Sequence, residues 1–226
     1  HPQQQQQQQQ HSSRITHSNR RMAIGTLSAV KIDGYDKAFE IIDQCSSSGV
    51  PSDELYDAVR LIDKNAIKIY TTLDDKQELW KTAHGSWKLQ LATGGGRSNT
   101  FKPVPIFAFA RIDPTNFGNG VGLNEDTVIL SLLGPHIWNE QRRQMIILID
   151  DIFLFSNRAT QSNLMPGFVK NGIGLGKRVD DYKKQRPPAF TFIGASETSL
   201  IARGGSGGIA IWTRLDRDIQ EAAYGN

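Results

Sequence analysis

Residues 84–96, HGSWKLQLATGGG, raise the question of whether this chain binds a phosphate. The three consecutive glycines, Gly94 to Gly96, could bring backbone N–H groups close to an anion. A phosphate-binding loop also needs a lysine followed by serine or threonine at a fixed spacing, and then a helix. The lysine is missing at that spacing, and FKPVPIFAF, which contains two prolines, follows instead. We therefore expect a loop between strands.

Acid–base or nucleophilic catalysis would need paired carboxylates, or a nucleophile beside a base. Asp150 and Asp151 are adjacent, so on a strand their side chains would point to opposite faces, and a turn explains them better. RGGSGG, residues 203–208, is expected to be a turn between two strands, and so it does not form a nucleophile elbow. The sequence predicts that the protein is not an enzyme.

Metal binding has equally little support. Cys45 is the single cysteine, so neither an internal disulfide nor a cysteine-based zinc site can form, and its place on an apolar helical face predicts core packing. His84 and His136 stand alone, and the other three histidines lie within the first 17 residues. The sequence predicts no metal and no cofactor.

Charge is distributed unevenly along the chain. The formal net charge of the 226 residues is +3, but residues 1–32 contain four basic residues and no acidic one, which leaves the rest at −1. A nearly neutral body lacks the clustered positive field of a nucleic-acid-binding protein. Residues 1–34 begin with a glutamine tract and are basic and hydroxylated, so we expect a disordered leader, either a transit peptide or an upstream extension before Met22.

A second basic stretch lies between residues 170 and 186. It predicts either a solvated loop or a surface that touches anionic lipid headgroups. Its basic residues are Lys170, Lys177, Arg178, Lys183, Lys184 and Arg186.

The periodicity of apolar residues places helices before strands. Residues 35–82 carry apolar side chains at helical spacing, with Ser52 expected to cap a second helix and a short third segment around Trp80. After His84 the period becomes two, and six further strand-like runs follow, separated by turn residues. Strands so closely spaced must pair mainly antiparallel, in a sandwich or a barrel. The predicted fold class is therefore α+β, mainly β. The six runs are VPIFAFARI, TVILSLL, QMIILI, IFLFS, AFTFIGA and GIAIWTRL.

A barrel of about eight strands has an interior that side chains either fill or leave wide enough for one small ligand. Alternation along the strands selects six candidate residues for such an interior. They are Leu89, Leu91, Phe107, Phe109, Phe192 and Trp212.

Two segments resemble a known family. LWKTAHGSWKLQLAT, residues 79–93, resembles the opening strand of the plastid lipid-associated proteins, or fibrillins, which also follows a helical segment. SLIARGGSGGIAIWTRL, residues 199–215, resembles their closing pair of strands, in which Arg203-Gly204 match an Arg-Gly pair. The family pattern is broken at Ala92, where a tyrosine is expected, at Ile201, where an arginine is expected, and by the lack of an acidic residue just before Leu200.

The resemblance implies a lipocalin-like barrel in a domain over residues 35–220, helical at 35–82 and β at 84–215, followed by a tail at 221–226. By analogy with other Gly-x-Trp barrels, Gly85 and Trp87 would plug the closed end, with Arg203 or Arg214 packed over the Trp87 ring. It also implies a plastid location, on thylakoids or plastoglobules, and favours a transit peptide in the leader.

The expected function is the non-enzymatic binding or organisation of apolar lipids, such as an isoprenoid, quinone, carotenoid or acyl lipid, at a peripheral membrane or lipid-droplet surface. Two alternatives stay open. A filled barrel would act through its surface as a structural or assembly protein, whereas a lipocalin-like enzyme would place Asp150 or Arg203 in a polar pocket.

Overall fold

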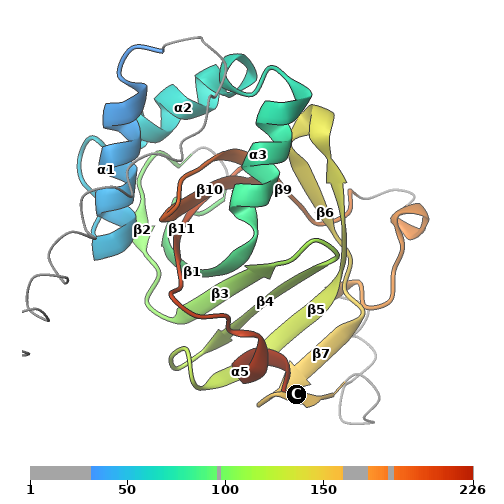
Figure 1. The fold of residues 1–226 in the computed structure, drawn as a ribbon. Coiled ribbons are helices and arrows are strands. Elements are labelled where there is room, and N and C mark those ends of the chain that lie inside the picture. Colours follow the sequence, from blue (N-terminus) through green and yellow to red (C-terminus); the bar gives the residue numbers. More distant parts are fainter. Residues whose placement is uncertain (1–31, 96–97, 160–172, 183–185, 226) are drawn as a thin grey trace, which may run out of the picture.

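The computed structural model describes residues 32–95, 98–159, 173–182 and 186–225 (Figure 1). Three helices precede the strands, within the range that helical periodicity predicts. They are α1 (Tyr35–Ser48), α2 (Leu55–Ile69) and α3 (Leu73–Ala83). Within the described part of the chain, no helix has the length and apolar character needed to cross a membrane.

The ends of these helices differ from expectation at one point. The Ser52 side chain does not cap α2. It accepts a hydrogen bond from the Cys45 thiol, and the Ser52 carbonyl receives the Leu55 N–H. A side-chain cap is found instead at α3, where Thr72 and Asp75 bond each other's backbone N–H groups in a capping box. This box fixes the start of the helix that leads into the first strand.

Eight strands form a closed antiparallel barrel, which confirms the predicted fold class. Each strand pairs with the next one in chain order, and the last pairs with the first, as in up-and-down barrels of the lipocalin type. The eight are β1 (Gly85–Ala92), β3 (Phe107–Ile112), β4 (Asn116–Gly122), β5 (Val128–Asn139), β6 (Gln144–Ile147), β9 (Ala189–Ala195), β10 (Ser199–Gly204) and β11 (Ile209–Arg214).

Shorter elements extend the barrel at its edges. Strand β2 (Lys102–Pro103) pairs with the end of β1, β7 (Asp151–Leu154) pairs with the first half of β5, and β8 (Asn157–Arg158) pairs with β7. Two short 3₁₀ helices span Glu140–Arg142 and Val179–Asp181.

Helices cover much of the outer surface of the barrel. Figure 1 shows α1 and α2 on one side and the short C-terminal helix α5 (Gln220–Tyr224) on the opposite side. Under α1, the buried hydroxyls of Ser46 and Ser199 lie 2.6 Å apart, and the Thr213 hydroxyl donates to the Ser46 carbonyl. The outward side chains of β10 and β11 therefore belong to a packed helix–barrel interface.

Helix α5 lies largely within residues 221–226, for which the sequence predicts only a tail. Ile219 and Ala223 are buried, and they pack on Phe107, Phe109 and Val128 on the outer face of the barrel. The hydroxyl of Ser131, on β5, donates to the Ala223 carbonyl at 2.6 Å. The end of the chain is thus part of the fold.

Strand β4 is missing from the strand-like runs predicted from the sequence because three of its seven residues are glycines. The outward face of β4 has no room for side chains. A Cβ at Gly118 would overlap the Tyr224 hydroxyl, and one at Gly120 would lie 2.7 Å from the Phe109 ring. Phe117, Asn119 and Val121 alternate with these glycines on the inward face.

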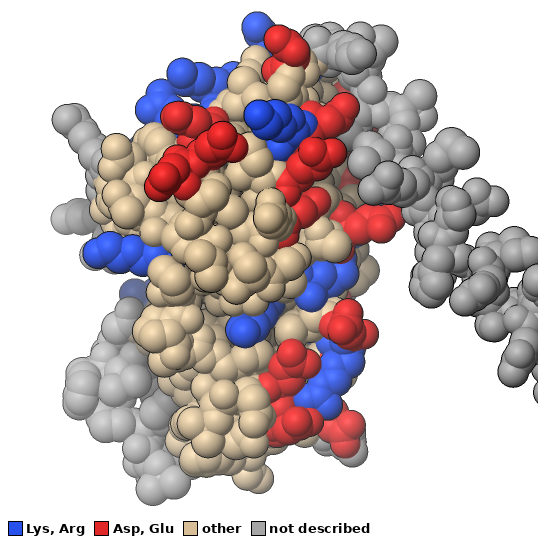
Figure 2. Space-filling view, turned by 90° about the vertical axis from the view of Figure 1, so that its left-hand side faces the viewer, with Lys and Arg blue, Asp and Glu red and all other residues tan. Residues whose placement is uncertain are grey.

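Both signs of charge occur on the face drawn in Figure 2. Acidic side chains gather over its upper part, where the helices lie, and much of its lower part is uncharged. This face shows no positive field of the kind that nucleic-acid binding requires.

Candidate functional site

The barrel is closed at the end where α3 enters β1, and Trp87 lies at its centre. Its side chain is fully buried, and its indole N–H donates to the Ala83 carbonyl at 2.9 Å. The Arg214 guanidinium lies over the indole, with Cζ 4.0 Å from the ring centroid. Of the two arginines suggested for this contact, Arg214 makes it and Arg203 does not.

Arg214 also fixes the polypeptide around this end. Its guanidinium donates to the carbonyls of Glu197 at 2.6 Å, Thr82 at 2.7 Å and His84 at 2.8 Å. Burial lowers the pKa of Arg214 from its ordinary value. Gly85 passes so close that a Cβ there would lie 2.5 Å from Arg214 Nη1, and its φ is +131°. Gly85 is therefore part of the plug, as the resemblance implies.

An aromatic cluster fills the adjacent half of the interior. Trp80 of α3 stacks on Trp138 of β5 with centroids 4.6 Å apart, and the edges of His84 and His136 contact it at 4.7 and 4.9 Å. Phe192 completes the cluster, 5.7 Å from Trp138. In the sequence the two histidines stand alone, because 52 positions separate them and only the closure of the barrel brings them to one tryptophan.

Polar atoms in this cluster are left without partners. His84 Nε2, Trp138 Nε1 and His136 Nδ1 are buried, and they make no hydrogen bond to the described residues. His136 Nε2 donates to the Asp113 carbonyl at 2.8 Å, which fixes the ring. Burial, and then the neighbouring His136, lower the pKa of His84. This end of the barrel is a rigid, packed cap.

The other half of the interior is hollow, with a cavity of about 270 Å³. Its walls come from the inward faces of β1, β3, β4, β5, β9 and β11, and nearly all of its lining side chains are apolar. The lining residues are Leu89, Ala108, Phe109, Ala110, Phe117, Asn119, Gly120, Val121, Leu130, Leu132, Phe190 and Trp212. The floor, toward α3, is aromatic: Phe190 lies 6.1 Å from Phe117 and 5.5 Å from Trp212.

Three of the six residues predicted for the interior face inward. Leu89 and Trp212 pair across β1 and β11 and line the cavity together. Phe192 also points inward, but it belongs to the aromatic cluster and does not line the cavity.

The other three are corrected. Leu91 follows an irregularity in β1 and pairs with Ile211, so it lies on the opposite face from Leu89, fully buried against the helical side. Phe107 and Phe109 lie on the outer face of β3 beneath α5. Phe109 nevertheless also lines the cavity, beside Gly120.

The wrong prediction of which strand face points into the barrel has one physical cause. Where a helix covers the outside of a barrel, both faces of the strand are apolar, and alternation no longer distinguishes inside from outside. In β3 the inward residues are Ala108, Ala110 and Ile112, which leave space for the cavity.

The other charged residues that were candidates for a catalytic role lie outside the interior. Arg203 bonds Asp63 of α2 at 2.6 Å on the outer face. Asp150 pairs with Arg178 at 2.6 Å, and Asp151 pairs with Arg158. These contacts hold loops and helices on the surface, and none of these side chains lines the cavity.

Two sequence-based suggestions fall partly outside the described residues. Gly94 and Gly95 lie against Gly208 of the β10–β11 turn, whereas Gly96 lies outside the described ranges. In the basic stretch, Lys177 lies over the Tyr182 ring, while Lys170, Lys183 and Lys184 fall outside those ranges. In the described part of the chain, no group of three histidine, cysteine or acidic side chains could hold a metal ion.

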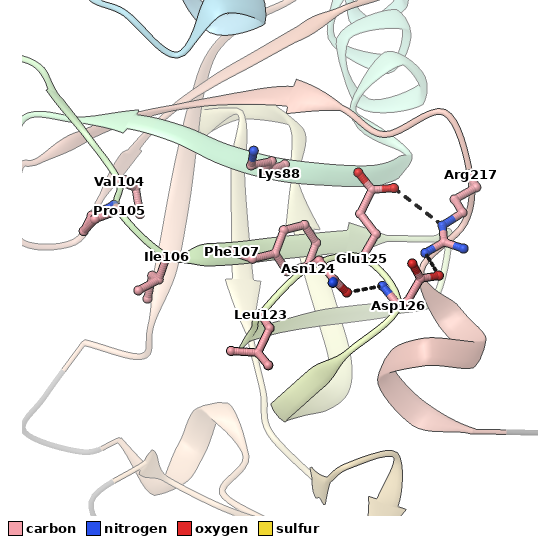
Figure 3. A pocket seen from close by; sticks show the side chains of 10 residues that line it. All are labelled: Lys88, Val104, Pro105, Ile106, Phe107, Leu123, Asn124, Glu125, Asp126 and Arg217. Carbon is pink, nitrogen blue, oxygen red and sulfur yellow. Dashed lines mark hydrogen bonds and ion pairs between the residues drawn. The ribbon is translucent and has the colours of Figure 1, made fainter.

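A second hollow lies on the outer surface between β1, β3 and the β4–β5 turn (Figure 3). It encloses about 470 Å³, and Ile106, Leu123 and Lys88 are among its lining residues. Arg217 closes one side by pairing with Asp126 at 2.6 Å and Glu125 at 3.5 Å. Because Arg217 is already paired, its charge is not free for a ligand.

Comparison with known proteins adds two solved structures. No protein-family model and no curated protein matches the chain. A lipocalin-like protein from Bacteroides uniformis is 15% identical, with 59% of this chain and 99% of that chain covered and a TM-score of 0.37. An uncharacterized protein from Bacteroides eggerthii is 10% identical, with 58% and 98% covered and a TM-score of 0.37. The description of the barrel depends on the strand pairings themselves.

Proposed function

We propose that the protein binds an apolar small molecule inside the barrel and does not transform it. The observation that carries this proposal is the cavity of about 270 Å³, with apolar walls, beside a half that is packed solid. The cavity is close to the lower end of the sizes seen for small-molecule sites, which begin at about 300 Å³. A barrel that acted only through its surface would have no need of such a hollow.

Burial of apolar surface is the driving force for this binding. Each Å² of ligand surface removed from water contributes about 25 cal/mol, so a few hundred Å² reach micromolar affinity after the costs of association. The aromatic floor of Phe117, Phe190 and Trp212 offers flat faces for the part of the ligand that enters first.

The enzymatic alternative receives little support from the cavity wall. Catalysis by proton transfer needs a titratable group within hydrogen-bonding reach of the reacting atom. Asp150 and Arg203, the two residues considered for this role, are both in ion pairs outside the cavity. None of the described residues that line the cavity has a titratable side chain.

We further propose that a lipid surface supplies the ligand. Ile106, Leu123 and Phe155 are 53%, 73% and 62% exposed, and they follow or precede strands at one edge of the sheet formed by β3, β4, β5 and β7. This apolar rim, as we call the three residues, lies at the strand ends next to the cavity-lining Ala108 and Leu130.

The backbone at Phe155 supports the same idea. Its φ is +47°, in the left-handed region, which costs a phenylalanine about 1 kcal/mol. A hairpin turn selected for stability alone would carry asparagine or glycine there. An exposed aromatic side chain held at this cost is best explained by a contact made outside the chain.

The resemblance to plastid lipid-associated proteins extends the proposal. It makes this chain a divergent relative of that family, carried to plastids by its leader and acting at thylakoids or plastoglobules. Isoprenoids, quinones, carotenoids and acyl lipids are the ligands to look for.

Native extraction followed by mass spectrometry of co-purifying organic molecules tests the proposal. A stoichiometric apolar compound would support binding in the barrel. Repeated recovery of membrane-associated protein with nothing bound would instead favour the structural alternative, in which the protein acts through its surface.

A further inference from the structure

Asn119 stands out among the residues that line the cavity. It lies on the inward face of β4, opposite Ala110 of β3 and Leu132 of β5, with Phe117 and Val121 two residues away on the same face. Among the described residues that line the cavity, it has the one side chain that can both donate and accept a hydrogen bond. Its amide makes no hydrogen bond to any residue that the structure describes.

Asn119 is partly exposed, so its amide is cut off from water only when the cavity is filled. An amide removed from water without a partner loses free energy. The neighbours of Asn119 across both adjacent strands are Ala110 and Leu132, and neither side chain can hydrogen-bond to the amide. A ligand that fills the cavity would cover the amide and would have to supply its partner.

The rest of the wall restricts what that partner can be. Among the residues that the structure describes, no lysine, arginine, histidine, aspartate or glutamate lines the cavity. A carboxylate, phosphate or ammonium group drawn into it would be buried without a counter-charge, which is strongly unfavourable.

We propose that Asn119 recognises the single uncharged polar group of an otherwise apolar ligand, a carbonyl or a hydroxyl. The inference rests on the proposed function, because it needs a ligand in this cavity. It makes Asn119 a specificity-determining residue that selects alcohols and ketones and discriminates against carboxylates.

The size of the cavity limits the part of the ligand that enters. A cavity of 150 Å³ holds one benzene molecule, so 270 Å³ holds about ten non-hydrogen atoms. A longer ligand would extend past Ala108 and Val121 toward the apolar rim, with its polar group near Asn119.

Four ten-carbon probes test this assignment: decane, decan-1-ol, decan-2-one and decanoate. Their binding to the full chain at pH 8 is measured by equilibrium dialysis with mass-spectrometric detection. Because the probes differ in hydration, the informative quantity is the affinity for each polar probe relative to decane, compared between the protein and its Asn119→Leu variant.

We expect Asn119→Leu to lower the affinity for decan-1-ol and decan-2-one about fivefold relative to decane, as the loss of one neutral hydrogen bond does. Decanoate should bind at least tenfold more weakly than decan-1-ol to the unmodified protein. Asn116→Leu is the matched control, because the Asn116 amide bonds the Thr115 hydroxyl and does not line the cavity. It should leave all the ratios unchanged.

Asn119→Ser provides a second variant if Asn119→Leu does not fold, and it should lower the same two ratios. Equal relative affinities in the protein and both variants would overturn the role of Asn119 while leaving the proposed function intact. Decanoate binding as well as decan-1-ol would do the same. Failure of all four probes to bind would overturn the proposed function and this inference together.

Discussion

The guanidinium of Arg214 lies 4.0 Å from the centre of the Trp87 ring, so the last strand of the barrel is locked over the first. The same side chain holds the carbonyls of Thr82 and His84, at the point where α3 passes into β1. One residue thus joins the last strand to the junction of α3 and β1, which lies far earlier in the chain. The barrel is thus tied together at the end opposite its hollow half.

Replacing Arg214 by lysine tests this lock. Lysine keeps the charge but loses the planar fork that reaches three carbonyls, and it stacks less well on an indole. We expect Arg214→Lys to lower the free energy of unfolding by about 2 kcal/mol, measured by denaturant titration. Arg217→Lys, which alters an exposed ion-paired arginine, should change it by less than about 0.5 kcal/mol. Equal losses in both variants would contradict the account.

Gly85 is predicted to be irreplaceable at the same end. A Cβ would lie 2.5 Å from Arg214 Nη1, and the φ of +131° is unfavourable for any L side chain. Gly85→Ala should therefore lower the melting temperature markedly. Gly205→Ala is the matched control, because no heavy atom lies within 4 Å of a Cβ there. If both variants melt at the same temperature as the protein, the plug is not a tight structure.

Periodicity predicts the helices and an antiparallel β body that is a sandwich or a barrel. The choice of a barrel and the role of Trp87 come from the resemblance to Gly-x-Trp barrels. The sequence does not predict the facing of β3. Phe107 and Phe109 are large and apolar in a strand whose inward residues include two alanines, since α5 buries the outer face. Periodicity shows that two faces exist, but only the packed helix shows which one is inside.

Two other features of the site require the closed structure. From the sequence, either Arg203 or Arg214 could pack over the Trp87 ring. The register of β1 and β11 places Arg214 opposite Trp87. Asn119 lies in β4, whose glycine-rich sequence is typical of a loop and not of a strand. The alternation of Phe117, Asn119 and Val121 is the signal that could have revealed it.

The half-buried His84 predicts a loss of stability in acid. Because burial lowers its pKa in the folded state, the unfolded chain takes up the proton first as the pH falls. The free energy of unfolding should be fully retained above the unfolded pKa of about 6.5 and should decrease below it. Denaturant titrations at pH 7.5 and 5.5 should show a smaller decrease for His84→Gln. An identical decrease in the two proteins would show that His84 does not contribute.

The apolar rim predicts a defined orientation on lipid. The double variant Leu123→Asp/Phe155→Asp should reduce co-sedimentation with uncharged phosphatidylcholine vesicles by about tenfold, because two apolar anchors are replaced by charges. Ile67→Asp is the matched control, since Ile67 is 77% exposed on α2, away from these strand ends. Equal loss in the control, or none in the double variant, would remove the rim from the account.

The central claim is that the hollow half of the barrel holds an apolar ligand, and Ala108→Phe tests it most directly. Ala108 lines the cavity, so the larger ring should occupy the space that the ligand needs. Ala189→Phe makes the same change on a residue that precedes the inward-facing Phe190 and so points outward. We measure binding of decan-1-ol by equilibrium dialysis in both variants, after confirming that each unfolds cooperatively. The account predicts at least a tenfold loss of affinity in Ala108→Phe and unchanged affinity in Ala189→Phe. Unchanged binding in a folded Ala108→Phe variant would contradict it.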